Sequence, residues 1–126
     1  MKKRILVIDD NCKDLYLMRF ILESDGFEVI EAETGTDGVQ KAKDSKLDLI
    51  IMDIKLHDCD VLETTRRIRE FDKATPIVAL SYRMLPGDEA LALEAGCTGY
   101  IIMPIDPDTI LCEIKSFLLV SRDSAV

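Results

Sequence analysis

Several marks of membrane, secreted and metal-knuckle proteins are missing from the sequence. No apolar run approaches the roughly 20 residues that span a bilayer. Lys2, Lys3 and Arg4 precede only a few apolar residues, so the start lacks the longer apolar core and the cleavage site of a secretory signal. The cysteines at positions 12, 59, 97 and 112 are too scattered for a metal knuckle or a C-x-x-C redox pair. We therefore expect a reduced, cytoplasmic chain that has no contact with a membrane.

Positive charge is also scarce. The 16 basic residues are outnumbered by 24 acidic ones, which gives a formal net charge of −8, and no strong local basic patch compensates. Such a chain repels nucleic acid and anionic lipid, so neither is an expected partner.

Linkers, internal repeats and low-complexity tracts are absent as well. With 126 residues and 48% hydrophobic content, the chain can bury the core of one domain without disulfides or a structural metal. We predict one domain over residues 1–122 and a short tail over residues 123–126.

Short apolar runs alternate with helix-length amphipathic stretches along the chain. The predicted strands are mostly β-branched or aliphatic, which is typical of strands covered on both faces, and they lie at residues 4–8, 27–31, 49–52, 77–80 and 100–102. Between them, apolar stripes at helical spacing comprise Leu15, Met18 and Leu22, then Leu62, Thr65 and Ile68, and finally Ile110, Ile114 and Phe117. This alternation predicts βα units around a parallel sheet.

Turn residues support these boundaries. Gly26 suits a left-handed cap after the first helix. Asp106 places a capping carboxylate before Pro107, so the last helix is predicted to start near Pro107. Right-handed crossovers then favour a doubly wound, five-stranded α/β fold of the flavodoxin-like (βα)5 type, with strand order 2-1-3-4-5.

Aspartates follow the first and third predicted strands. Asp9 and Asp10 come after residues 5–8, and Asp53 comes after residues 49–52. The ligand crevice of such a sheet lies beyond the carboxyl ends of its strands, where the winding reverses between strands one and three. Any one of these aspartates is equally well explained as a helix cap or a solvent-facing residue, but together at the switch point they favour a site.

Three carboxylates in one pocket repel each other unless a pKa rises or a hard cation binds. Mg²⁺ suits such an oxygen-rich acidic cluster. A carboxylate beside that ion can attack a phosphorylated donor, and the expected product is an aspartyl phosphate.

With these residues in place, the chain resembles the receiver domains of two-component response regulators, including the stand-alone chemotaxis and cell-cycle kinds. The resemblance covers nearly the whole chain. It rests on Val7-Ile8-Asp9-Asp10-Asn11, on Met52-Asp53-Ile54-Lys55-Leu56, on Ala79-Leu80-Ser81, and on Ala95-Gly96 followed by Tyr100 and Pro104.

The resemblance implies a role for each residue of the acidic site. Asp53 is the expected phosphoacceptor. Asp10 and Asp53 are expected to ligate Mg²⁺ together with the backbone carbonyl of Lys55, and Asp9 is expected to contribute through water. The domain is then no enzyme, beyond catalysing its own phosphorylation and dephosphorylation.

The resemblance also implies a switch. The Ser81 hydroxyl would bond a phosphoryl oxygen and pull the following loop inward, and Tyr100 would swing between exposed and buried positions as the readout. The plainer interpretation is that Ser81 caps a loop and that Tyr100 is a half-buried strand aromatic.

One departure from the family is important. The family keeps a lysine directly before the proline that follows strand five, and Met103 occupies this position. A thioether carries no charge and donates no hydrogen bond, so a cation expected beside the phosphoryl group is missing. Lys55 or Arg83 could replace part of that charge. The hypothesis is that Asp53 is phosphorylated but switches the domain weakly, or that the domain docks proteins with little dependence on phosphate.

Three alternatives to a receiver share some of these features. A flavodoxin-like redox protein must cradle a phosphate in its first βα loop, which Asp9-Asp10-Asn11 would repel. A haloacid-dehalogenase phosphatase pairs its nucleophile with an Asp two residues on, where this chain has Asn11 and Lys55. The third alternative is a phosphorylation-independent pseudo-receiver that acts as a docking module, which Met103 keeps open.

The expected partners are proteins. A sensor histidine kinase or a phosphotransfer protein would supply the phosphoryl group, and output would go to a downstream protein that the sequence does not identify. In the family, the surface of helix four, strand five and helix five docks partners or forms homodimers, and Tyr100 borders it.

Overall fold

The computed structural model describes residues 2–53, 61–81, 88–102 and 106–124. Strands and helices alternate through these residues, as the apolar runs predict. In order they are β1 (Arg4–Ile8), α1 (Cys12–Ser24), β2 (Glu28–Ala32), α2 (Gly35–Asp44), β3 (Leu49–Asp53), α3 (Val61–Arg69), β4 (Ile77–Ser81), α4 (Asp88–Ala95), β5 (Gly99–Ile102) and α5 (Ile110–Ser124).

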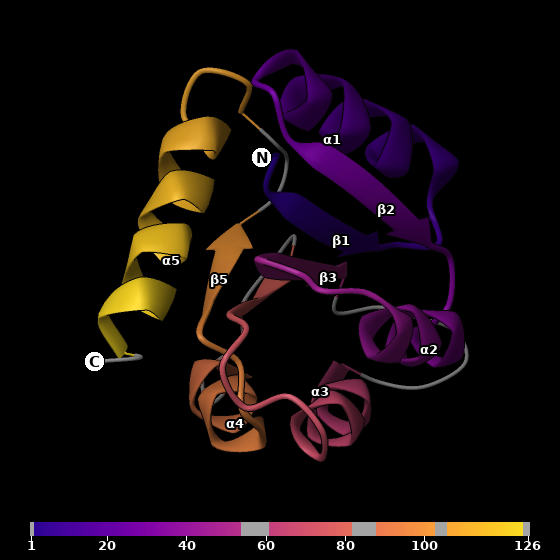
Figure 1. The fold of residues 1–126 in the computed structure, drawn as a ribbon, viewed down its shortest axis with the longest axis vertical. Coiled ribbons are helices and arrows are strands. Elements are labelled where there is room, and N and C mark those ends of the chain that lie inside the picture. Colours follow the sequence, from indigo (N-terminus) through magenta and orange to yellow (C-terminus); the bar gives the residue numbers. More distant parts are fainter. Residues whose placement is uncertain (1, 54–60, 82–87, 103–105, 125–126) are drawn as a thin grey trace.

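The strands pair in parallel as one five-stranded sheet in the order β2-β1-β3-β4-β5. This order confirms the predicted doubly wound fold. Helices α1 and α5 cover one face of the sheet, and α2, α3 and α4 cover the other (Figure 1). The winding therefore reverses between β1 and β3, which is where such sheets bind their ligands.

Alternate residues of each strand enter two apolar cores on opposite faces of the sheet. Ile5 and Val7 of β1 belong to the core that also contains residues of α1 and α5, whereas Leu6 and Ile8 belong to the core shared with α2, α3 and α4. None of these four side chains is more than 1% exposed. Each such burial stabilises the fold by roughly 1.5–3 kcal/mol, which explains why the strands are apolar on both faces.

The end of α1 follows from Gly26, whose φ of +90° lies in the left-handed region. The Gly26 N–H donates to the Glu23 carbonyl at 3.1 Å, and the Phe27 N–H donates to the Leu22 carbonyl at 3.1 Å. These two bonds form a Schellman cap, so the predicted left-handed cap is confirmed. Because the Phe27 N–H serves the cap, β2 starts at Glu28, one residue later than predicted.

Three other strands differ by one residue from the predicted ranges. β3 extends to Asp53, β4 extends to Ser81, and β5 begins at Gly99. Asp53 and Ser81 are thus held by strand pairing.

The last helix starts later than its proline suggests. The Asp106 carboxylate accepts from the Asp108 N–H at 2.9 Å, and the Asp106 carbonyl accepts from the Ile110 N–H at 2.9 Å. Residues 107–109 form a turn that these hydrogen bonds stabilise, and α5 begins after it, at Ile110 rather than near Pro107. α5 continues to Ser124, beyond residue 122.

A glycine lets α2 approach β1 closely. A Cβ atom on Gly38 would lie 2.8 Å from Ile8 Cγ1 and nearer still to Ile8 Cδ1. Thr34 caps the same helix, because its hydroxyl accepts from the Asp37 N–H at 3.0 Å. These contacts place the start of α2 beside the carboxyl end of β1.

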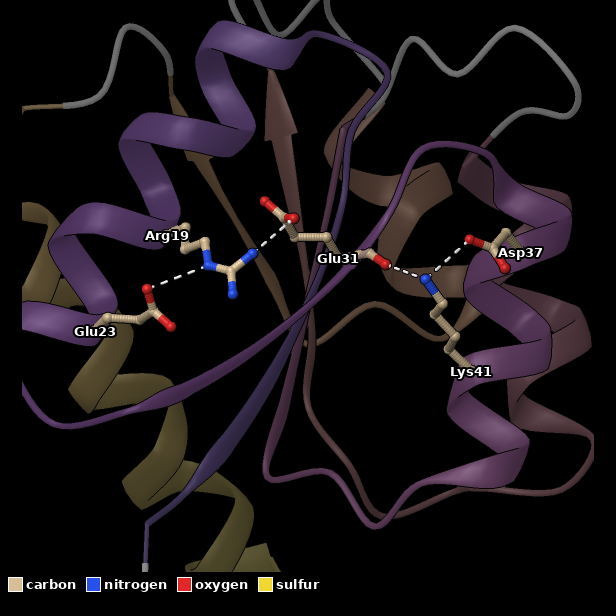
Figure 2. A network of polar contacts seen from close by, with 5 residues as sticks. All are labelled: Arg19, Glu23, Glu31, Asp37 and Lys41. Carbon is tan, nitrogen blue, oxygen red and sulfur yellow. Dashed lines mark hydrogen bonds and ion pairs between the residues drawn. The ribbon is translucent and has the colours of Figure 1, made fainter.

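Charged side chains flank the edge strand β2. Figure 2 shows Arg19 of α1 between Glu23, at 3.2 Å, and Glu31 of β2, at 3.0 Å. On the other side, Lys41 of α2 pairs with Asp37 at 3.2 Å and donates to the Glu31 carbonyl. Charges along an edge discourage pairing with another strand.

Arg69 joins the ends of α3 and α4. Its Nε donates to the Gly96 carbonyl at 3.0 Å, and its Nη1 donates to the carbonyls of Asp72 at 3.0 Å and Thr75 at 2.7 Å. Burial lowers the pKa of Arg69 from its ordinary value, against the opposing effect of nearby Asp72. One half-buried guanidinium therefore satisfies three carbonyls from two segments, the connection between α3 and β4 and the end of α4.

Candidate functional site

The site begins with the pairing of β1 and β3 at the centre of the sheet. Ile8 lies opposite Met52 in the register, so the residues that follow them meet at the same edge. Asp9 and Asp10 follow β1, and Asp53 is the last residue of β3. Parallel pairing across the switch point therefore brings Asp53 close to Asp9 and Asp10, although they are 44 and 43 positions apart in the sequence.

Three carboxylates converge there. One oxygen from each of Asp9, Asp10 and Asp53 lies within 4.8 Å of the others. Asp9 is buried at 1% exposure, while Asp10 and Asp53 are half-buried. The fold thus assembles the pocket that the strand-end aspartates predict.

Asn11 supports this cluster in two ways. Its backbone N–H donates to Asp9 Oδ1 at 2.9 Å, which fixes the buried carboxylate. Its side-chain oxygen accepts from the N–H groups of Lys13 at 2.9 Å and Asp14 at 3.3 Å, so Asn11 is also the N-cap of α1. This supporting role was missed from the sequence. An Asn directly before an amphipathic stretch is the capping signal that could have found it.

The electrostatics of the pocket disfavour ionisation of Asp9. Burial, the largest cause, and the negative charge of Asp53 raise the pKa of Asp9 from 3.8 to about 7, against the opposing hydrogen bond from the Asn11 N–H. A hard cation with oxygen ligands relieves this repulsion. The donor set is therefore one that fits Mg²⁺, with Asp9, Asp10 and Asp53 able to hold it.

The predicted switch residues lie on the neighbouring strands. Ser81 ends β4 at 3% exposure, one position beyond Leu80, which is opposite Asp53 in the register. Tyr100 lies in β5 opposite Ala79 and is half-buried against the core on the α2, α3 and α4 face. Ser81 thus shares the edge of the carboxylates, and Tyr100 lies one strand further out.

Three of the sequence-based expectations concern residues outside the described ranges. These are Lys55, Arg83 and Met103. Their expected contributions stay predictions.

In the described ranges, none of the helices is both long and apolar enough to cross a bilayer.

Comparison with known proteins identifies a family. The model of the response regulator receiver domain matches residues 5–115. The chain is 34% identical over 115 residues to the transcriptional regulatory protein ResD of Bacillus subtilis, which covers 91% of the chain and 48% of ResD. It is also 32% identical over 120 residues to the polar-differentiation response regulator DivK of Brucella anthropi, which covers 94% of the chain and 98% of DivK. The chain thus spans about half the length of ResD but nearly all of DivK.

Solved structures agree in fold. The CheY-like response regulator receiver domain protein from Methanospirillum hungatei superposes with a TM-score of 0.92 at 28% identity, covering 98% of this chain and 99% of that one. The receiver domain of a sensor histidine kinase from Pseudomonas aeruginosa, with a magnesium ion in its active-site cleft, superposes with a TM-score of 0.85 at 28% identity. That match covers 94% of this chain and 98% of the other.

Proposed function

The chain belongs to the response regulator receiver domain family, and we propose that it accepts a phosphoryl group on Asp53 from a histidine kinase or a phosphotransfer protein. Phosphorylation of an aspartate and binding of Mg²⁺ are general to receivers, which are signalling modules. The convergence of Asp9, Asp10 and Asp53 within 4.8 Å is the observation that carries the assignment to this pocket.

Among the three carboxylates, Asp53 is the best candidate for the nucleophile. Asp10 and Asp53 are both half-buried, so an incoming donor can reach either, whereas Asp9 is 1% exposed and bonded to the Asn11 N–H. Asp53 is preferred to Asp10 because it stands at the position of the phosphoacceptor in the family's motif. Asp10 and Asp53, the backbone carbonyl of Lys55, and Asp9 through water would hold Mg²⁺. When bound, the ion supplies positive charge that neutralises phosphoryl oxygens.

The transfer forms one bond and breaks one. A carboxylate oxygen of Asp53 attacks phosphorus, and the bond from phosphorus to the imidazole nitrogen of the donor breaks in line with it. The bonding electrons return to that nitrogen, so the product is an acyl phosphate on Asp53. With acetyl phosphate as donor, the phosphorus–oxygen bond breaks and acetate leaves.

Ser81 and Tyr100 are the proposed readout. The Ser81 hydroxyl, at the same edge of the sheet, would donate to a phosphoryl oxygen and draw in the segment that follows β4. Tyr100 is half-buried, so an inward rotation has room to change its exposure.

The direct test is incubation of the purified chain with acetyl phosphate and Mg²⁺, followed by intact-mass measurement. We expect one phosphoryl adduct, lost in Asp53→Asn and retained in Asp44→Asn, which removes an exposed carboxylate on α2. An adduct that persists in Asp53→Asn would assign the acceptor elsewhere.

A second candidate function is a docking module that works without phosphate. Met103 favours it, because the family has a lysine at this position and a thioether cannot pair with the phosphoryl group. Met103→Lys separates the two functions. If the switch is weakened by Met103, the variant should show a larger change in Tyr100 NMR signals on phosphorylation. An unchanged response to acetyl phosphate would contradict that explanation.

Output would occur through protein contact on the face formed by α4, β5 and α5. Leu93 of α4 and Ile102 of β5 are 48% and 49% exposed, and such apolar side chains suit a protein partner or a second copy. Sedimentation with and without acetyl phosphate tests homodimer formation, and Ile102→Lys should abolish any dimer formed by this face.

The receiver unit is proposed to span residues 1–122, with a cytoplasmic location. The location is supported by Cys12, Cys97 and Cys112, which are free thiols.

A further inference from the structure

A second hollow lies at the opposite edge of the sheet from the carboxylates. It has a volume of about 1080 Å³ and is lined by the amino-terminal ends of β1, β2 and β3, by the end of α2, and by the segment between α3 and β4. The chain enters β1 at this edge (Figure 1). Strands of five residues, at about 3.3 Å per residue, separate the two edges by roughly 16 Å. We call this hollow the amino-edge pocket.

Cations gather in the amino-edge pocket although the chain carries a net charge of −8. Lys2 and Arg4 come from the start of the chain, and Lys43 and Lys46 come from the end of α2 and the loop after it. Arg4 is engaged by Glu28 at 2.9 Å. Within the described part of the chain, the three lysine ammonium groups form no ion pair.

The carboxylates of the pocket, in contrast, are already engaged. Glu28 pairs with Arg4, and Asp48 accepts the Arg4 backbone N–H at 2.8 Å. Asp72 accepts from the Thr75 hydroxyl at 2.6 Å and from the Thr75 N–H at 3.0 Å. Burial acts to raise the pKa of Asp72, but these hydrogen bonds and the charge of Arg69 outweigh it and hold the pKa below its ordinary value. These hydrogen bonds fix the carboxylates in place, and the lining as a whole has four cationic side chains against three anionic ones.

An aromatic ring completes one wall. Phe71 is 40% exposed, and the Lys43 ammonium lies 5.6 Å from the centre of its ring. A flat ligand could stack on such a ring, while a phosphate beside it would meet Lys43 and Lys46. The volume suits a ligand of drug or nucleotide size.

We propose that the amino-edge pocket binds a small phosphorylated ligand with a flat ring, of the nucleotide kind. Two kinds of contact act together: lysine ammonium groups attract the phosphates, and Phe71 receives the ring. The three carboxylates at the other edge repel the same ligand, so the two sites select opposite charges. The pocket is open to solvent, so binding is weak and sensitive to salt.

The test is an NMR titration of the ¹⁵N-labelled chain with ADP in EDTA, which keeps Mg²⁺ away from the carboxylates. We expect saturable shifts at the amides of the pocket and a Kd on the order of 1 mM or below. Pyrophosphate, which lacks the ring, and adenosine, which lacks the phosphates, should each bind at least about fivefold more weakly. If pyrophosphate bound as tightly as ADP, the proposed role of Phe71 would be overturned.

Paired variants separate this site from general charge effects. Lys43→Gln/Lys46→Gln should weaken ADP binding roughly tenfold, while Arg66→Gln/Lys115→Gln removes the same charge outside the pocket and should change it little. Phe71→Leu should abolish the preference for ADP over pyrophosphate. Thermal melting establishes that each variant is folded.

Equal losses in both double variants, or no saturable shift with ADP, would overturn the proposal. Asp53→Asn should bind ADP as the wild type does. The proposal for the amino-edge pocket and the proposal for Asp53 as phosphoacceptor can thus be refuted independently of one another.

Discussion

We expect Asp9→Asn to stabilise the metal-free protein at alkaline pH. Asp9 is buried at 1% exposure, and its carboxylate lies in the cluster with Asp10 and Asp53. Asparagine has nearly the same shape, and its carbonyl oxygen can still accept the Asn11 N–H that now donates to Oδ1 at 2.9 Å. The substitution therefore removes a buried negative charge while keeping the local geometry.

The magnitude follows from the pKa of Asp9, which burial and the charge of Asp53 raise from 3.8 to about 7. Between these pH values the folded protein binds more protons than the unfolded chain, so wild-type stability falls as the pH rises through this window. One pKa unit corresponds to about 1.4 kcal/mol, which sets an upper limit of about 4 kcal/mol on the penalty above pH 7. Because the buried asparagine amide also needs a partner, we expect a gain of about 1–3 kcal/mol at pH 8 and almost none near pH 4.

Urea unfolding in EDTA, followed by circular dichroism from pH 4 to pH 8, measures this gain. Asp44→Asn is the matched control, because Asp44 is exposed on α2 and outside the cluster. Added Mg²⁺ should stabilise the wild type more than Asp9→Asn, which has lost a site carboxylate. A variant no more stable than the wild type at pH 8, or a gain that is equal at all pH values, would refute this reasoning.

Three further substitutions test the scaffold. Gly38→Ala should cost about 1–3 kcal/mol in urea unfolding because its Cβ would overlap the Ile8 side chain. Adding Ile8→Val should recover part of this loss, and no recovery would contradict the overlap. Arg69→Met should cost about 2 kcal/mol because the carbonyls it satisfies lose their donor; Arg69→Lys should recover little, since an ammonium lacks the planar fork of donors. Asn11→Ala should cost about 1 kcal/mol through the lost N-cap, and Asn11→Ser should recover most of it, so an equal loss in the serine variant would exclude capping as the cause.

The fold could be predicted from sequence because its signals are local. Apolar runs of about five residues between amphipathic stretches specify strands buried on both faces, and the handedness of crossovers then restricts the strand order. Asp9 and Asp53 could be placed together for the same reason: each directly follows such a run, and parallel pairing brings the ends of neighbouring strands to one edge.

The remaining details depend on contacts between distant segments. β2 starts at Glu28 because the Phe27 N–H is used by the cap of α1, which no property of residues 27–32 indicates. The amino-edge pocket could not be predicted from the sequence either. Its lysines come from two separate stretches of the sequence, so they gather only when the end of α2 folds against the start of β1.

The carboxylate cluster destabilises the folded protein, and buried, well-packed residues beside it hold it in place. A penalty of about 1–3 kcal/mol at Asp9, below its upper limit of about 4 kcal/mol, is a sizeable part of the roughly 5–15 kcal/mol that usually separates folded from unfolded domains. Ile8 and Met52, which precede the cluster, are both 0% exposed and anchor it to one core, while Asn11 fixes the turn that follows. A bound cation relieves that repulsion only in the folded protein. Binding of the cation therefore raises the free energy of unfolding. A receiver with three ionised carboxylates is therefore least stable when empty, and its stability should report directly on what the pocket holds.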